Sequence, residues 1–414
     1  MLTRMKLNTK SNLEVIKIHN EHQLGRNYYC SMKFKYLKID LESKMTYNCH
    51  AAKPHVVDFN WLKEHPGQIF NTDINVQERQ QMLDNVRNAS CEQNCWHAED
   101  RGAISPRLEQ RGLEQTHTNI KPMPEIIDLT INGDCNLTCS YCCKEFSSSW
   151  RRDIVIGGDY PLQDNRYQAN NKDRVLLQIS QDTLKSTTQY QILLNEIASM
   201  ASTLKQLTIT GGEPFLDNSL IQTLTNLKLN PNTVIEIYTG LGVSFARFKK
   251  IIFELEQLAN VSIVVSAEST GEFLEFNRFG NKWQEFLDKV DLLKRSNVQL
   301  AFQCTLTNLT LFDIHRFYEK FKGTKIIPTF AYSPTMMAPY VLDPASKEQV
   351  RANIVDLPIN IQTMILDSIK ATPAEEQRTN IGKFLLEFVR RRPTLTLDIF
   401  PQSFLTWLRI SNVV

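Results

Sequence analysis

The sequence predicts an α/β fold: a partial (β/α)6 TIM-like barrel that follows a small cysteine-rich domain and precedes C-terminal helices. From residue 125 to residue 335, short apolar segments with the pattern of strands alternate with segments of helical periodicity. Such alternation is typical of a parallel sheet with right-handed crossover helices. Six strand-and-helix units are too few to close an eight-stranded barrel, so we expect an open, curved sheet.

The barrel elements follow from this alternation in chain order. The polar segment Ser147–Asp173 is predicted to be a long loop, and residues 336–414 a helical extension that includes the amphipathic segment Ile381–Arg392. The expected strands are Glu125–Asn132, Gln206–Thr210, Val234–Thr239, Val261–Ala267, Val298–Leu306 and Lys325–Ala331. The expected helices are Tyr190–Met200, Phe245–Leu258, Trp283–Arg295 and Leu311–Phe321.

Residues 1–110 are expected to form a separate domain rich in cysteine. Alternating apolar and charged residues over Phe34–Leu41 predict one strand of a hairpin that turns near Glu42–Lys44. The apolar spacing over Val76–Asn88 predicts a helix, and two cysteines follow it directly. This domain is therefore a β-hairpin with a helix.

Composition and charge restrict the function. Lysine plus arginine number 47 and aspartate plus glutamate 45, so the net charge is +2 and no polyanionic partner is required. The most apolar segments, such as Val261–Ala267, are too short to span a bilayer, and Met1–Lys10 has no apolar signal core. We expect a cytoplasmic protein with no membrane partner, whose nine cysteines are not structural disulfides.

Four of these cysteines lie in the segment Cys135-Asn-Leu-Thr-Cys139-Ser-Tyr141-Cys142-Cys143, directly after the first predicted barrel strand. Three thiolates at the spacing of Cys135, Cys139 and Cys142 can bind three irons of a 4Fe-4S cube and leave the fourth open, as a reactive centre requires. A zinc site is the alternative that the spacing leaves open. The carboxyl end of a parallel strand favours a catalytic role. The Cys143 side chain is expected to point away.

This segment resembles the signature of the radical S-adenosylmethionine (SAM) superfamily, in which three cysteines are spaced by three and then two residues and an aromatic residue precedes the last. The resemblance covers about residues 125–331. It implies that Cys135, Cys139 and Cys142 hold a 4Fe-4S cluster that binds SAM, and that Tyr141 lies beside the SAM adenine.

Further segments resemble SAM-binding elements of the same superfamily. The residues Gly211-Gly212-Glu213-Pro214 are similar to the element that ends the second strand and holds the SAM amino group; taken alone, they are also consistent with a simple turn. Ser266 and Glu268 resemble the residues that bond the ribose hydroxyls. Arg278 resembles the arginine that pairs with the SAM carboxylate, which a planar guanidinium suits. For Glu268 and Arg278, exposed surface charges are the alternative.

Four thiols in the first domain are the number that a structural zinc or a complete iron–sulfur cluster needs: Cys30, Cys49, Cys91 and Cys95. With the motif Glu99-x-x-Gly102-x-x-Ser105-x-Arg107, they resemble the twitch module of the SPASM-like radical SAM group, which carries an auxiliary 4Fe-4S cluster. In better-known members this module follows the barrel, whereas here it precedes it. A zinc knuckle is the alternative, because spacing does not distinguish zinc from iron.

The resemblance implies a radical SAM enzyme that cleaves SAM reductively to a 5′-deoxyadenosyl radical, which abstracts hydrogen from a substrate. It implies a low-potential electron donor such as flavodoxin or ferredoxin, and a peptide, nucleoside, sugar or other metabolite as substrate. The alternative is a radical SAM barrel whose N-terminal zinc knuckle binds RNA or protein. Basic stretches such as Arg390-Arg391-Arg392 favour that alternative, and the small net charge disfavours it.

Overall fold

The computed structural model describes residues 28–102, 105–111, 117–178 and 185–410. Met1–Lys10, on which the expected absence of a signal segment rests, lies outside these residues. The chain divides into two compact units. The first comprises residues 1–131, 182–209 and 222–235, and the second comprises residues 132–181, 210–221 and 236–414.

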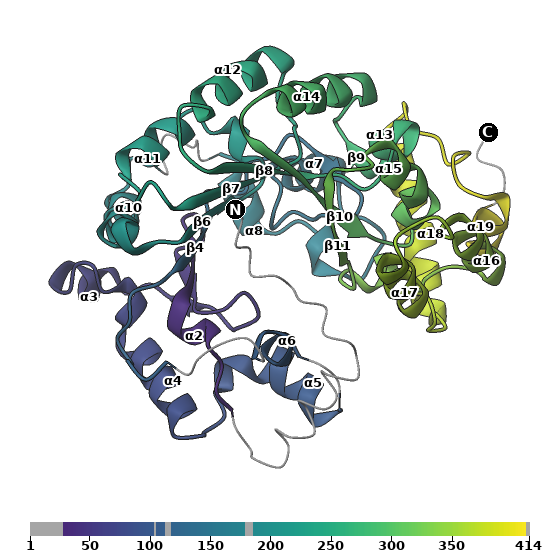
Figure 1. The fold of residues 1–414 in the computed structure, drawn as a ribbon. Helices are drawn as coiled ribbons and strands as arrows, with labels where there is room; N and C mark the ends of the chain where they lie inside the picture. The colour runs from purple at the N-terminus through teal and green to yellow at the C-terminus, as the bar shows by residue number, and fades with distance from the viewer. Residues whose placement is uncertain (1–27, 103–104, 112–116, 179–184, 411–414) are drawn as a thin grey trace. The chain divides into compact units, whose positions relative to one another are not determined.

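Nine strands form one mostly parallel sheet in the order β11-β10-β8-β7-β6-β4-β1-β2-β3 (Figure 1). Strand β1 is parallel to β4 and β10 is parallel to both β8 and β11, whereas β2 is antiparallel to β1 and β3. All six strands expected after residue 125 are present, which confirms the α/β fold class. The strands are β1 Tyr36–Asp40, β2 Met45–Tyr47, β3 His55–Val56, β4 Ile126–Thr130, β6 Gln206–Thr210, β7 Val234–Thr239, β8 Val261–Ser266, β10 Gln299–Leu306 and β11 Lys325–Phe330.

The helices of the second unit form by local rules that helix α12 illustrates. The hydroxyl of Ser244 accepts a hydrogen bond from the backbone N–H of Arg247 and so caps the first turn. Its buried residues recur at intervals of three and four, and this apolar face packs against α14. The larger helices of this unit are α7 Ser148–Gly157, α12 Phe245–Leu255, α13 Gly271–Asn277, α14 Trp283–Arg295, α15 Ile314–Lys320, α16 Pro344–Asn353, α17 Ile359–Ser368, α18 Glu375–Arg390 and α19 Gln402–Trp407.

The remaining helices are shorter or belong to the first unit. They are α2 Met32–Lys35, α3 Phe59–Glu64, α4 Asp73–Leu83, α5 His97–Asp100, α6 Pro106–Arg111, α8 Asn171–Leu176, α10 Thr188–Met200 and α11 Leu220–Asn226. Within the described ranges, no helix combines the length and the apolar character that a membrane span requires.

Three local expectations are wrong. Ser147–Asp173 is not a long loop, because Trp150 and Ile154, one helical turn apart, are both buried and so make α7 amphipathic. The helix expected to end at Asn88 ends at Leu83, since Asn85 adopts a left-handed backbone with φ of 59°. The strand expected from Phe34 begins only at Tyr36, because the preceding four residues form α2.

A buried ion pair organises the first unit. The Lys33 ammonium is 1% exposed and donates hydrogen bonds to Asn48 (2.6 Å), Glu78 (2.6 Å) and Ser90 (2.7 Å). Burial would raise the pKa of the Glu78 carboxyl, but the neighbouring His55 ring and the hydrogen-bonded Lys33 ammonium outweigh it and hold that pKa well below its usual range. Residues distant in the sequence are thereby tied to one buried charge pair.

We predict that Glu78→Gln destabilises the protein at pH 7 by about 3–5 kcal/mol, because Lys33 then stays buried without a counter-charge. A carboxyl with a depressed folded pKa contributes stability above its unfolded pKa of about 4.3 and loses it as pH falls through the folded value. The difference between wild type and variant should therefore be constant above about pH 5 and shrink below about pH 4.

Urea unfolding at these pH values measures the effect. Glu64→Gln, at an exposed position in α3, is the control and should change stability little at any pH. Equal stability of wild type and Glu78→Gln at pH 7 would contradict the assignment of this ion pair.

Candidate cofactor-binding site

Three cysteines expected to act together lie in one buried group of the second unit. Cys135 and Cys139 are buried and pack with Leu137, and Cys142 packs against them. The two-residue strand β5 (Thr138–Cys139) is antiparallel to β9 (Arg278–Phe279) and places Cys139 opposite Arg278. The sequence spacing thus brings three thiols into one group, with a guanidinium beside them.

The thiols of this group are held in their neutral form. Burial raises the pKa of the Cys135 thiol to about 12 and that of the Cys139 thiol to about 11. The guanidinium of Arg278, whose Nη1 lies 3.8 Å from the Cys139 Sγ, acts in the opposite direction on Cys139. A metal that binds here must displace the thiol protons, and a cation is already in place beside one of the resulting thiolates.

The neighbouring Cys143 has different surroundings. Its thiol is buried, and burial together with the adjacent Glu145 raises its pKa to about 12. The group formed by Cys135, Cys139 and Cys142 does not include it. That Cys143 is a bystander stays a prediction.

Helix α7 holds the backbone of the cysteine loop. The Ser147 hydroxyl donates to the Leu137 carbonyl (2.8 Å) and also accepts from the Trp150 backbone N–H (3.3 Å). The indole Nε1 of Trp150 donates to the Cys139 carbonyl (2.9 Å). These contacts could not be predicted from the sequence, because the segment that makes them is expected there to be a loop.

Glycines form a socket for the middle of the loop. A Cβ atom built at Gly240 or at Gly280 would lie 2.8 Å from a methyl group of Leu137, and one at Gly242 would lie 2.5 Å from the Asn136 side chain. At distances under 3 Å, a side chain at any of these positions would force Leu137 or Asn136 to shift. Sequence reasoning missed these glycines; the only local signal was their position directly after β7 and β9.

The Glu213 carboxylate joins two loops of the second unit. One oxygen accepts from the Phe215 N–H (3.2 Å) and the Thr239 hydroxyl (2.6 Å), and the other from the N–H groups of Gly240 (3.0 Å) and Gly242 (3.1 Å). Burial nevertheless raises the pKa of Glu213. Four donors saturate a carboxylate, so this side chain fixes the socket rather than remaining open to a ligand.

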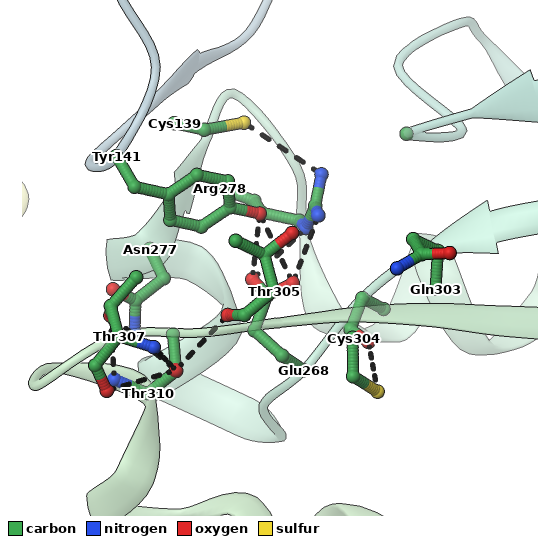
Figure 2. A network of polar contacts seen from close by, with 12 residues as sticks. Cys139, Tyr141, Glu268, Asn277, Arg278, Gln303, Cys304, Thr305, Thr307 and Thr310 are labelled. Atoms are coloured by element: carbon green, nitrogen blue, oxygen red, sulfur yellow. Dashed lines mark hydrogen bonds and ion pairs between the residues drawn. The ribbon is translucent and has the colours of Figure 1, made fainter. Parts of the chain in front are cut away.

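Glu268, Arg278 and Tyr141 form one polar network (Figure 2). Two nitrogens of Arg278 bond the two Glu268 oxygens at 3.1 and 2.9 Å, and the Tyr141 hydroxyl donates to both oxygens at 3.1 Å. Glu268 is 1% and Arg278 4% exposed, so the alternative of exposed surface charges is wrong for both. The structure thus brings Tyr141, Glu268 and Arg278 together around one ion pair, whereas their expected contacts with SAM stay a prediction.

The remaining expected SAM-binding residues lie at the ends of strands. Gly211 follows β6 with a φ of 147°, and the Gly212 N–H donates to the Asn132 carbonyl at 2.8 Å. Pro214 begins a short 3₁₀ turn that ends at Leu216. Ser266 is the last residue of β8 and is partly exposed.

A second thiol group lies in the first unit. Its four cysteines are buried and belong to one apolar cluster, and they line one small cavity: Cys30, Cys49, Cys91 and Cys95. The cations Lys33 and Arg107 also line this cavity. The cysteines of the hairpin and those of the helical segments therefore line the same cavity.

Charge and burial act in opposite directions on these thiols. Burial first, and then neighbouring thiols, raise the pKa of Cys49 to about 12 and that of Cys91 to about 11, whereas Lys33 acts in the opposite direction on both. The predicted Glu99-to-Arg107 motif also comes together, since the Ser105 hydroxyl and the Arg107 guanidinium both donate to Glu99. In the described part of the chain, no three His, Cys, Asp or Glu side chains are arranged to hold a single metal ion.

Comparison with known proteins finds similarity only among solved structures. No family model matches the chain, and no curated protein matches it. Native anSMEcpe with bound AdoMet is 16% identical over 60% of this chain and 63% of its own, with a TM-score of 0.36. Streptococcus suis SuiB bound to precursor peptide SuiA is 12% identical over 78% and 69%, with a TM-score of 0.31. The chain thus spans under two thirds of anSMEcpe, and the likeness is distant.

We predict that Gly280→Ala disorders the cysteine loop, because its methyl group would enter the position of Leu137. The matched control is Gly323→Ala: φ is positive at both glycines (113° and 86°), but nothing lies within 4 Å of a Cβ at Gly323. Both variants should lose about 1–3 kcal/mol of stability from the backbone strain.

Hydrogen exchange separates the two effects. Amides of residues 135–142 should exchange faster in Gly280→Ala than in Gly323→Ala when both are compared at equal distance from their unfolding temperatures. Equal exchange in the two variants would show that the socket does not hold the loop.

Proposed function

We propose that the protein is a radical SAM enzyme that holds a 4Fe-4S cluster on Cys135, Cys139 and Cys142. The observation that carries this proposal is the buried group of three thiols with the Arg278 guanidinium beside it. Three thiols leave one iron of a cube without a protein ligand, as a reactive cluster requires. Cys143 is the one further cysteine nearby in the sequence, and the packed group of Cys135, Cys139 and Cys142 does not include it.

Cys135, Cys139 and Cys142 would hold the cluster, which would supply the one-electron reductive cleavage of SAM and so the abstraction of hydrogen from a substrate. The residues of this chain position the ligands and exclude water. The socket of Gly240, Gly242 and Gly280 fixes the thiols, and Glu213 fixes the socket. The loop of Gly211 and Gly212 after β6 is assigned to the SAM ammonium, because glycines let the backbone approach a ligand closely.

The network of Tyr141, Glu268 and Arg278 is assigned to the rest of SAM. The Tyr141 ring suits the adenine, and Ser266 suits a ribose hydroxyl. Glu268 can accept from the ribose only where the Tyr141 hydroxyl releases one of the two carboxylate oxygens that it now contacts. Arg278 bonds Glu268 through its Nε and Nη2 atoms, while its Nη1 faces the Cys139 sulfur. That nitrogen is placed to donate to a carboxylate bound next to the cluster.

We further propose an auxiliary 4Fe-4S cluster on Cys30, Cys49, Cys91 and Cys95. Four thiols around a cavity, with buried cations beside them, suit an anionic cube. A single zinc needs its four sulfurs about 2.3 Å from one point. Cytoplasmic location and a low-potential electron donor are part of the same proposal.

The alternative of an RNA-binding module loses part of its support. It rested on basic stretches such as residues 390–392, yet Arg392 is 3% exposed and its guanidinium lies among aromatic rings. A nucleic-acid surface needs such groups exposed to phosphates.

We predict that alanine at Cys135, Cys139 or Cys142 abolishes SAM cleavage by anaerobically reconstituted, dithionite-reduced protein, because the cube then loses a thiolate. Cys143→Ala is the matched control and should retain most of the activity. Formation of 5′-deoxyadenosine measures the outcome. If Cys143→Ala is as inactive as Cys142→Ala, the ligand assignment is wrong.

A triple Cys135/Cys139/Cys142→Ala variant isolates the second site. After reconstitution it should retain about four irons, one complete cluster. Metal analysis that finds one zinc and no iron would replace the auxiliary cluster by a structural zinc, and a protein with neither metal would reject the site.

A further inference from the structure

The basic segment Arg390–Arg392, at the C-terminal end of helix α18, is largely buried. Arg390 is exposed and pairs with Glu387, whereas the side chains of Arg391 and Arg392 are only 6% and 3% exposed. Two buried guanidinium groups at the end of a helix carry a large desolvation cost unless their donors are used. The partners of both groups lie around the cysteine loop and α7.

Arg392 is enclosed by aromatic rings. Its guanidinium carbon lies 3.9 Å from the centre of the Phe388 ring, 5.2 Å from that of Phe279 and 5.3 Å from that of Trp150. Its nitrogens donate to the Thr138 hydroxyl (3.2 Å) and to the Tyr160 hydroxyl (3.1 Å). Cation–π contacts and these hydrogen bonds stabilise the buried charge together.

The contacts of Arg392 reach both sides of one cysteine. Thr138 and Phe279 face each other in the β5–β9 ladder, and Cys139 is the next residue of β5. Trp150, which packs on Arg392, also donates to the Cys139 carbonyl. A single guanidinium therefore contacts the residue before Cys139, the opposite strand and the ring that bonds the Cys139 backbone.

Arg391 holds the other end of α7. Its nitrogens donate to the carbonyls of Asp153 and Gly158, both at 2.9 Å, and its guanidinium lies 4.1 Å from the Tyr160 ring. A Cβ at Gly157 would lie 2.7 Å from Nη1 of Arg391. The two arginines thus tie the C-terminal helix to both ends of α7.

We propose that Arg392 is a positioning residue for Cys139, so that the C-terminal extension is part of the cysteine site. The arginine touches no thiol; it acts through Thr138, Phe279 and Trp150. Its loss leaves the Thr138 hydroxyl and the aromatic rings without their common partner, and the β5–β9 ladder then opens more often. This inference deepens the proposed function, but the placement of Cys139 by Arg392 is a property of the metal-free chain.

The test compares Arg392→Met, Arg392→Lys and the matched control Arg390→Met in full-length, metal-free protein. Iodoacetamide labelling of each cysteine is followed by mass spectrometry. In Arg392→Met, Cys139 should label roughly tenfold faster than in wild type, the factor that loss of one hydrogen bond to a charged group represents. Arg392→Lys keeps the positive charge but loses the planar guanidinium, so its Cys139 should label at a rate between those of wild type and Arg392→Met. In Arg390→Met, Cys139 should label at the wild-type rate.

The four cysteines of the first unit serve as an internal reference, because a general loss of stability would accelerate them equally. If Cys139 labels at the wild-type rate in Arg392→Met, or if all cysteines accelerate alike, the proposal is overturned. Should Arg392→Met fail to fold, Thr138→Val removes only the hydroxyl acceptor and must itself accelerate Cys139.

Iron content distinguishes this inference from the proposed function. Wild-type protein that takes up no iron on Cys135, Cys139 and Cys142 would refute the proposed cluster, while the labelling difference at Cys139 would remain. Wild-type protein that binds iron but shows no labelling difference in Arg392→Met would refute the positioning role alone.

Discussion

The buried ion pair of Arg278 and Glu268 is the interaction on which the candidate site depends. Two charges removed from water are stable only where their geometry is good and their remaining hydrogen-bonding capacity is used. Here the pair is bidentate, the Tyr141 hydroxyl donates to the same carboxylate, and the third guanidinium nitrogen faces Cys139. Because these residues follow β8, form β9 and belong to the cysteine loop, one pair connects three segments of the second unit.

The position of the thiols is set by the protein around them. Neutral thiols attract one another weakly, and burial keeps the pKa of Cys135 and Cys139 far above neutral. Contacts away from the sulfurs hold the loop instead: glycines that admit Leu137, and α7, whose Trp150 bonds the Cys139 backbone. A site arranged in this way loses little conformational entropy when a ligand binds, which is the benefit of preorganisation.

The features that depend on local sequence pattern could be predicted from the sequence. The role of a residue could not be predicted where it depends on partners distant in the sequence. Apolar alternation was sufficient for the six barrel strands, and cysteine spacing for the thiol group. Helix α7 was missed because its buried apolar residues, Trp150 and Ile154, stand in a short segment that is followed by Gly157–Gly158 and a polar stretch. Arg391 and Arg392 look like a surface stretch in the sequence, since only the folded chain encloses them with aromatic rings.

The two thiol groups share one electrostatic arrangement. In each, a buried cation stands beside the sulfurs and a carboxylate holds it there: Lys33 with Glu78 in the first unit, Arg278 with Glu268 in the second. Each cation lowers the pKa of a neighbouring thiol, such as Cys139, against the effect of burial. The carboxylates offset the charge while the thiols are protonated, so neither site contains an isolated buried cation. When Cys139 ionises, Nη1 of Arg278 already faces its sulfur, so no charged side chain of the second unit has to move to stabilise the new negative charge.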